Sequence, residues 1–294
     1  MKRKLIILVF FLVGLKLSAQ KASSLNIWNL PPLPVEKGSF SANWDSLKIY
    51  NTPDWYRDAK LGIWAHWGPQ SVPEYGDWYF RRMYIQGNTE EFEGREPASS
   101  YHLNKYGHPS EFGYKDLIPL FKAEKWDPEA LMKLYYHAGA RYFMSMGQHH
   151  DNFDMWNSKY QPWNSVNMGP KRDIVKEWQT AAKNNKMRFG VSFHGEVAWQ
   201  LFEVSRMSDT TGPKKGVPYD GWLTKDDGKG KWWEGYDPRD LYCYPHKPSN
   251  PYVLCCPDES KDIPDSAFLT KFYKWITADL RYNCPISHLV TMPL

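Results

Sequence analysis

The chain has 294 residues, which is enough for one large domain or two small ones, and its formal net charge is +4. Four basic residues within the first 20 positions account for this whole excess, so the remainder is close to neutral and gives no electrostatic reason to expect nucleic-acid binding. Beyond these 20 residues, no hydrophobic run is long enough to span a membrane.

The first 20 residues predict a secretory signal peptide. Residues 2–4 are positively charged, residues 5–15 are almost wholly apolar, and residues 17–19 offer a small-residue cleavage site. The apolar run is too short to cross a bilayer, and no cysteine follows it for lipid attachment. We therefore expect an exported protein, periplasmic or secreted, with no membrane span after signal cleavage; a permanent N-terminal anchor is the alternative.

Aromatic residues make up 16% of the chain, including 15 Trp and 19 Tyr. Aromatic faces can stack on the C–H faces of sugar rings, so this content is compatible with carbohydrate binding. On composition alone, a large aromatic core is the simpler explanation. The four cysteines, at positions 243, 255, 256 and 284, lack metal-binding spacing and are expected to be free thiols.

Three short apolar runs follow a proline-containing lead-in at residues 21–50. They occupy residues 61–66, 141–147 and 187–193, are rich in aromatic residues and are bounded by glycine, which predicts buried strands. Each ends in a polar turn that carries histidine.

Helices are predicted before the later strands. In the first, over 127–139, aspartate and proline begin an apolar stripe that a glycine ends. A second is predicted over 173–183 and a third over 268–280, after which a fourth strand should start near Cys284. This alternation predicts an α/β fold with a parallel sheet.

Two parallel architectures compete: an open doubly wound sheet and a (β/α)8 TIM-like barrel. No glycine-rich phosphate loop follows the first strand, and three strands carry histidine at the carboxyl end, where barrels build their active sites. We therefore expect an incomplete barrel of three to four βα units. Its long loops, at about 67–115 and 195–265, are expected to carry function.

The residues at these strand ends are His66, His149, His150 and His194. A neutral imidazole can donate to or accept from a sugar hydroxyl, whereas a lone histidine is more often a hydrogen-bonded core residue. Their common position favours a site. Zinc or iron is the alternative, but adjacent His149 and His150 should point apart on an extended chain, so we expect no metal and no cofactor.

The loop after the first strand contains Asp77, Trp78 and Tyr79. Trp78 is a candidate platform for stacking on a sugar ring. Glu74 and Asp77 are nearby carboxylates, but an acid in a loop is commonly a solvated charge.

Several of these segments together resemble the α-L-fucosidases of glycoside hydrolase family 29. The resemblance covers roughly residues 50–282, and Asn152 stands where the family usually has glycine. The segments that carry it are Lys60-Leu61-Gly62-Ile63-Trp64-Ala65-His66-Trp67-Gly68, Ser71-Val72-Pro73, Asp77-Trp78-Tyr79, His149-His150-Asp151-Asn152-Phe153, Pro170-Lys171-Arg172-Asp173-Ile174-Val175 and Phe189-Gly190-Val191-Ser192-Phe193-His194.

The resemblance implies a retaining hydrolase that releases terminal α-L-fucose from fucosylated glycans, with residues 51–294 forming the N-terminal part of its catalytic barrel. By the same resemblance, His66, Trp78, His149 and His150 look like fucose-binding residues, and His194 matches a histidine of one branch of the family.

The end of the chain departs from the family pattern. A retaining glycosidase needs two carboxyl groups roughly 5–5.5 Å apart, and in this family the aspartate nucleophile follows strand four with the acid/base further along. Here no acid follows Asp279. Residues 285–287, Pro-Ile-Ser, are what codons for the family's Pro-Asp-Leu give when read one base later.

We therefore expect a frameshift after Asn283 and a truncated, inactive chain in which no catalytic residue is assigned. A genuine short paralogue is the alternative for the tail. For function, the alternatives are a non-catalytic fucose- or sugar-binding fragment and, more remotely, a metal hydrolase that uses the histidines.

Overall fold

The computed structural model describes residues 39–41, 43–87, 95–195, 198–244 and 289–291. The predicted signal peptide at 1–20, the predicted helix at 268–280 and three of the cysteines lie outside these residues. Cys243 is buried, and its Sγ accepts a hydrogen bond from the side-chain amide of Asn152 at 3.2 Å. Among the described residues, none of the helices combines the length and apolar character that crossing a membrane requires.

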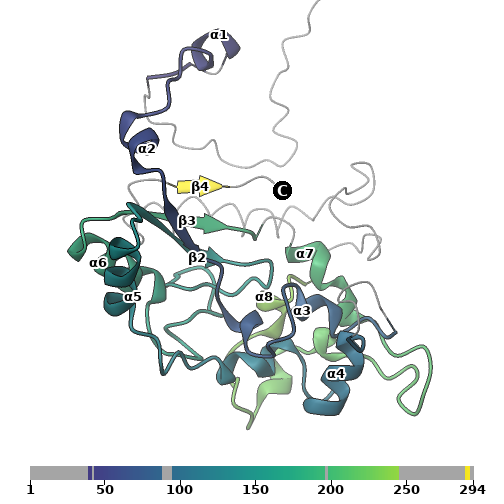
Figure 1. Cartoon of the computed structure of the whole chain (residues 1–294). Helices are drawn as coiled ribbons and strands as arrows, with labels where there is room; N and C mark the ends of the chain where they lie inside the picture. The colour runs from purple at the N-terminus through teal and green to yellow at the C-terminus, as the bar shows by residue number, and fades with distance from the viewer. Residues whose placement is uncertain (1–38, 42, 88–94, 196–197, 245–288, 292–294) are drawn as a thin grey trace, which may run out of the picture. The chain divides into compact units, whose positions relative to one another are not determined.

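A four-stranded parallel sheet forms the centre of the described fold (Figure 1). Its strands lie in chain order, and they are β1 (Gly62–Ala65), β2 (Tyr142–Gln148), β3 (Arg188–Phe193) and β4 (Leu289–Thr291). The three predicted strands and their parallel arrangement are thus confirmed. The fourth strand begins at Leu289, later than the position near Cys284 that the sequence predicted.

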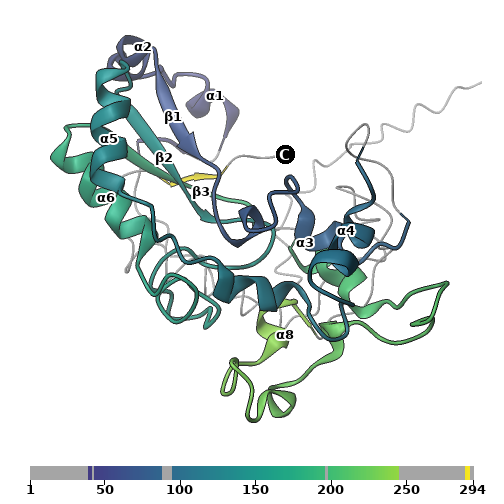
Figure 2. The ribbon, with the colours of Figure 1, turned by 60° about the horizontal axis from the view of Figure 1, so that its bottom comes forward.

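Two long helices, α5 (Pro128–His137) and α6 (Ile174–Asn184), lie side by side next to these strands (Figures 1 and 2). Each begins where the sequence predicted, because Asp127 and Asp173 accept hydrogen bonds from backbone amides of the first turn. Helix α6 contacts β2 and β3 and buries one apolar face.

Aromatic residues build much of the core between helices and sheet. The ring of Phe143 on β2 stacks on Tyr135 of α5 and lies 4.5 Å from the ring of Trp178 on α6. Trp156, Trp163 and other large aromatic side chains are almost completely buried. The aromatic core that composition favoured is therefore confirmed for the described residues.

Short helices occupy the segment before β1 and the long loops after β1 and β3. Before β1 lie α1 (Trp44–Leu47) and α2 (Asp54–Ala59). The loop after β1 contains α3 (Tyr79–Arg82), α4 (Ala98–Lys105) and the 3-10 helices η1 (Pro69–Ser71) and η2 (Tyr114–Leu120). The loop after β3 contains α7 (Ala198–Leu201), α8 (Pro238–Leu241) and the 3-10 helices η3 (Phe202–Arg206), η4 (Asp220–Trp222) and η5 (Lys225–Gly228).

Candidate functional site

The histidines of the candidate site follow the carboxyl ends of three neighbouring strands. His66 comes directly after β1, His149 and His150 after β2, and His194 after β3. Because the strands are parallel, their carboxyl ends meet at one edge of the sheet. The fold therefore brings residues from distant parts of the sequence to one place.

The imidazole rings contact one another at this edge. The ring centre of His149 lies 4.8 Å from that of His66, 5.0 Å from that of His150 and 5.9 Å from that of His194. The indole of Trp78 meets His150 edge to face at 5.6 Å. All five residues that the sequence assigned to the site thus lie together, and we call them the histidine cluster; their binding of sugar stays a prediction.

The two adjacent histidines do not point apart as the sequence argument expected. A shift in strand register between Met146 and Gln148 marks a bulge at the end of β2, and the chain turns at His150. Bulges of this kind re-aim the side chains that follow them. Both His149 and His150 consequently face the same cluster.

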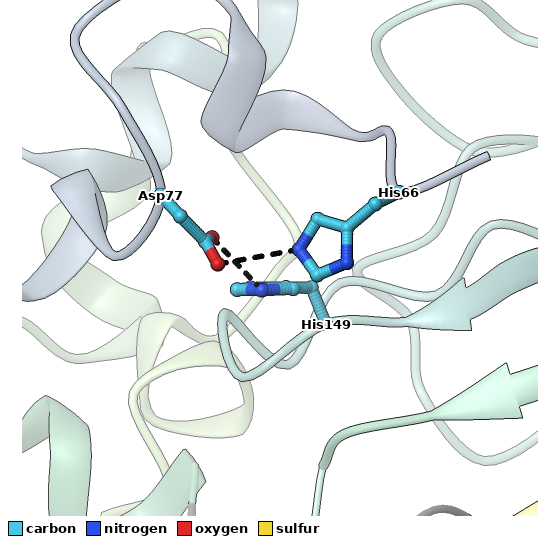
Figure 3. A group of neighbouring side chains, drawn as sticks. All are labelled: His66, Asp77 and His149. Carbon is cyan, nitrogen blue, oxygen red and sulfur yellow. Dashed lines mark ion pairs between the residues drawn. The ribbon is translucent and has the colours of Figure 1, made fainter. Parts of the chain in front are cut away.

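Asp77 completes the cluster, although the sequence argument favoured a solvated loop charge. Its Oδ2 lies 3.3 Å from Nε2 of His66, and its Oδ1 lies 3.0 Å from Nε2 of His149 (Figure 3). The contact between Oδ1 of Asp77 and Nε2 of His149 is close but is not a well-aligned hydrogen bond. Asp77 is thus exposed, as expected of a loop acid, and it also contacts two histidines; Glu74 is exposed as well.

The electrostatics of the cluster favour an ionised carboxylate. Burial alone would raise the pKa of Asp77, but its contacts with His149 and His66 outweigh burial and hold the pKa far below its ordinary range.

The other two imidazoles are held neutral. Burial, helped by neighbouring His149 and His194, lowers the pKa of His150 to about 3. Burial, helped by His149 and His66, lowers the pKa of His194 to about 4. At neutral pH both rings carry one donor and one acceptor nitrogen, which suits hydroxyl recognition.

Asp77 and Trp78 lie in a turn whose backbone is strained at Trp78. Trp78 has φ of 61°, in the left-handed region, which costs a bulky residue on the order of 1–3 kcal/mol. The backbone amide of Trp78 donates to Oδ1 of Asp77 at 2.9 Å, and Arg82 donates to the carbonyl oxygen of Asp77 at 2.7 Å. These contacts hold the turn that aims both side chains at the histidines.

Trp64, which was not among the predicted site residues, also contacts the cluster. Its indole stacks on the ring of His194 at 5.6 Å, and its Nε1 donates to Oγ of Ser192 at 2.9 Å. Successive side chains of a strand alternate between two faces, so Trp64 and His66 share one face. That alternation was the signal that would have identified Trp64.

Asp151 belongs to the packing beneath the cluster. It is fully buried, burial raises its pKa, and its Oδ2 accepts a hydrogen bond from the hydroxyl of Tyr114 on η2 at 2.5 Å. The next residue, Asn152, has φ of 57°. Asparagine is one of the few residues that adopt this conformation readily, which explains how it stands in place of the family's usual glycine.

A buried network around Asp220 connects the two long loops. Asp220 on η4 accepts hydrogen bonds from the hydroxyls of Tyr84, at 2.7 Å, and Tyr242, at 2.5 Å. The ammonium of Lys115 on η2 lies 3.1 Å from the same carboxylate. Gly113 is required beside it, because a Cβ there would lie 1.9 Å from Oδ2 of Asp220.

Comparison with known proteins places this chain in a family. The family model described as alpha-L-fucosidase matches residues 32–245. Human plasma alpha-L-fucosidase is 34% identical over 160 residues, which cover 52% of this chain and 32% of the relative. The alpha-L-fucosidase of Branchiostoma floridae is 35% identical over 160 residues, which cover 52% of this chain and 33% of the relative. The chain's match therefore spans about a third of the length of these curated relatives.

The chain is also similar to solved structures. The alpha-fucosidase of Thermotoga maritima in complex with fucose is 36% identical, with a TM-score of 0.47 and coverage of 52% of this chain and 37% of that one. Since the family model covers well over half of the sequence, the chain belongs to the α-L-fucosidase family of glycoside hydrolases.

Proposed function

We propose that this chain recognises the terminal α-L-fucose of fucosylated glycans through the histidine cluster, Asp77 and Trp64. The observation that carries the proposal is the convergence of four imidazoles, two indoles and one carboxylate at a single edge of the sheet. A sugar presents hydroxyls that need directed polar partners and apolar C–H faces that need flat ones, and this edge offers both kinds.

The residues divide naturally between these two tasks. Asp77 accepts hydrogen bonds from hydroxyls, whereas the imidazoles can both donate and accept. The contacts of Asp77 with His66 and His149 fix the direction of its oxygens. The indoles of Trp64 and Trp78 lie against the rings of His194 and His150 and supply the apolar surface. A preorganised set of this kind reduces the entropy lost on binding.

The reaction that we propose for the α-L-fucosidase family is retaining hydrolysis. One carboxylate attacks the anomeric carbon and forms a covalent glycosyl-enzyme, while a second carboxyl group protonates the leaving oxygen and then activates water. Asp77 does not suit either role, because its two oxygens are engaged by His66 and His149. Asp77 is the carboxylate that lies at the cluster within the described residues, so we propose that this chain binds fucose there without hydrolysing fucosides.

We also propose that the sheet is the start of a TIM-like barrel within residues 51–294. The support is the sequential strand order β1-β2-β3-β4 with parallel pairing, which is the order that a barrel requires. Export through the signal at residues 1–20, to the periplasm or the exterior, is part of the same proposal and rests on the charge and hydropathy of that segment.

Calorimetry on the folded chain tests the recognition, with L-fucose and galactose as ligands. We expect L-fucose to bind more tightly than galactose and His66→Ala to weaken binding at least about tenfold, the loss expected for about 1.4 kcal/mol. His137→Ala is the matched control, since His137 is exposed on α5 and makes its contact with the Lys133 carbonyl. Equal or absent binding of both sugars would refute the proposal.

An assay with an aryl α-L-fucoside tests the second part of the proposal, that this chain does not hydrolyse fucosides. We expect no release of the aryl group above the rate without protein. Release that persists after purification and disappears when a single carboxylate of this chain is replaced would show that the chain is catalytic.

A further inference from the structure

Three side chains at this edge of the sheet meet in an arrangement that suits a metal ion. His66, Asp77 and His149 each offer one donor atom, and these atoms all lie within 4.8 Å of one another. They come from the ends of β1 and β2 and from the loop between them, and Figure 3 shows the carboxylate facing both imidazoles. The group therefore combines residues that the fold, not the local sequence, has assembled.

Two of the separations, each to a different oxygen of Asp77, are close to those of a small tetrahedral centre. Zinc binds imidazole nitrogen and carboxylate oxygen at roughly 2.0–2.2 Å, so two ligands of a tetrahedral ion stand about 3.3 Å apart. Each imidazole Nε2 lies at nearly this distance from a carboxylate oxygen, 3.3 Å for His66 and 3.0 Å for His149.

His149 provides an independent indication of a ligand. Its side chain is only 2% exposed, yet neither ring nitrogen makes a well-aligned hydrogen bond within the described residues, although Nε2 is close to Asp77. Buried polar atoms in folded proteins normally have a partner. An ion between His149 and Asp77 would take the nitrogen lone pair that the direct contact leaves poorly used.

From these observations, we propose that His66, Asp77 and His149 bind a divalent transition-metal ion of the zinc class, and that this ion competes with the sugar. The inference rests on the proposed function, because it assigns the same three residues to both ligands. Imidazole and carboxylate are suitable ligands for zinc, and three protein ligands leave a coordination position for water. Regulation by such an ion would couple sugar binding to metal availability.

The affinity of these three residues for zinc should be moderate. Strong zinc sites orient each histidine by a hydrogen bond from its second ring nitrogen, and Nδ1 of His149 lacks such a partner among the described residues. His66 and Asp77 are also open to solvent, with 32% and 49% of their side-chain surface exposed, which lets an ion enter and leave.

Zinc titration of the full chain tests the proposal by calorimetry, after the cysteine thiols have been alkylated so that they do not bind the metal. We expect one zinc per chain, and we expect His66→Ala and Asp77→Asn to weaken it at least about tenfold. His137→Ala removes an exposed histidine outside the cluster and should leave zinc binding unchanged. Circular dichroism identifies any variant that fails to fold.

A second experiment measures competition between zinc and L-fucose on the unaltered chain. L-fucose should raise the apparent dissociation constant for zinc in proportion to its concentration, and zinc should do the same to that for L-fucose, because both ligands need the same residues. Zinc binding that survives Asp77→Asn, or that ignores L-fucose when both ligands bind, would overturn the inference. If L-fucose binds and zinc does not, this inference fails while the proposed function stands.

Discussion

The side-chain amide of Asn152 donates a hydrogen bond to the carbonyl oxygen of Asp240, 2.8 Å away, and so joins the turn after β2 to helix α8. The same amide donates to the carbonyl oxygen of Leu241 at 3.0 Å, and the Oδ1 of Asn152 accepts from Gln148 at 3.0 Å. One residue thus combines a left-handed backbone with a link between two loops, and it lies directly after His149, His150 and Asp151.

Two substitutions of Asn152 separate these contributions. Asn152→Gly keeps the backbone conformation and removes the hydrogen bonds, whereas Asn152→Ala also imposes the left-handed strain of about 1–2 kcal/mol. We expect both variants to be less stable than the unaltered chain, and alanine to be less stable than glycine by about 1 kcal/mol. Urea unfolding measures the difference, and an alanine variant as stable as the glycine variant would contradict the assignment of strain.

The Asp220 network predicts a large loss of stability for a single substitution. Asp220→Ala leaves Lys115 and the hydroxyls of Tyr84 and Tyr242 buried without their shared acceptor, which should cost about 3 kcal/mol. Thermal and urea unfolding measure this cost. Asp226→Ala, at an exposed position on η5, is the matched control and should change stability little; equal effects of the two substitutions would contradict the account.

Buried His102 on α4 predicts how stability depends on pH. Burial lowers the pKa of His102 from its ordinary 6.5 to about 4, against the raising influence of the Phe112 carbonyl and of Asp116. A carbonyl can only accept, so Nε2 carries the proton toward Phe112 and Nδ1 accepts from the hydroxyl of Tyr79 at 2.8 Å. Folding therefore requires the neutral ring.

The direction of this pH dependence of stability follows from proton binding. Between pH 6.5 and 4 the unfolded chain binds a proton at His102 that the folded chain does not, so this residue's contribution is complete above pH 6.5 and is lost on acidification. On acidification from pH 6.5 to 4, the free energy of unfolding should fall by about 3 kcal/mol. Unfolding at pH 7 and pH 5 should show a smaller pH effect for His102→Gln than for the unaltered chain, and an unchanged effect for His137→Ala. Identical pH dependence in all three proteins would contradict the assignment.

The strands, two helices and four histidines could be predicted because each depends on short-range pattern. Apolar runs bounded by glycine gave β1, β2 and β3, and the aspartates at 127 and 173 gave the starts of α5 and α6. Histidines that follow parallel strands must then meet at one edge, whatever the loops do.

The position of Asp77 could not be predicted in the same way. It depends on the left-handed turn at Trp78 and on contacts with His149, which is 72 positions away in the sequence. Asp220 is a similar case, because its partners lie in other loops and no periodic pattern marks a buried acid. The bulge that turns His149 and His150 to one side also has no clear signal beyond the glycine at 147.

The most direct test of the central claim uses the histidine rings as reporters. In the full chain with isotope-labelled histidine, nuclear magnetic resonance records the ring signals of the nine imidazoles. Addition of L-fucose should shift the signals of His66, His149, His150 and His194 and leave those of buried His102 and exposed His137 in place. Binding of L-fucose that leaves the four cluster signals unshifted would contradict the account.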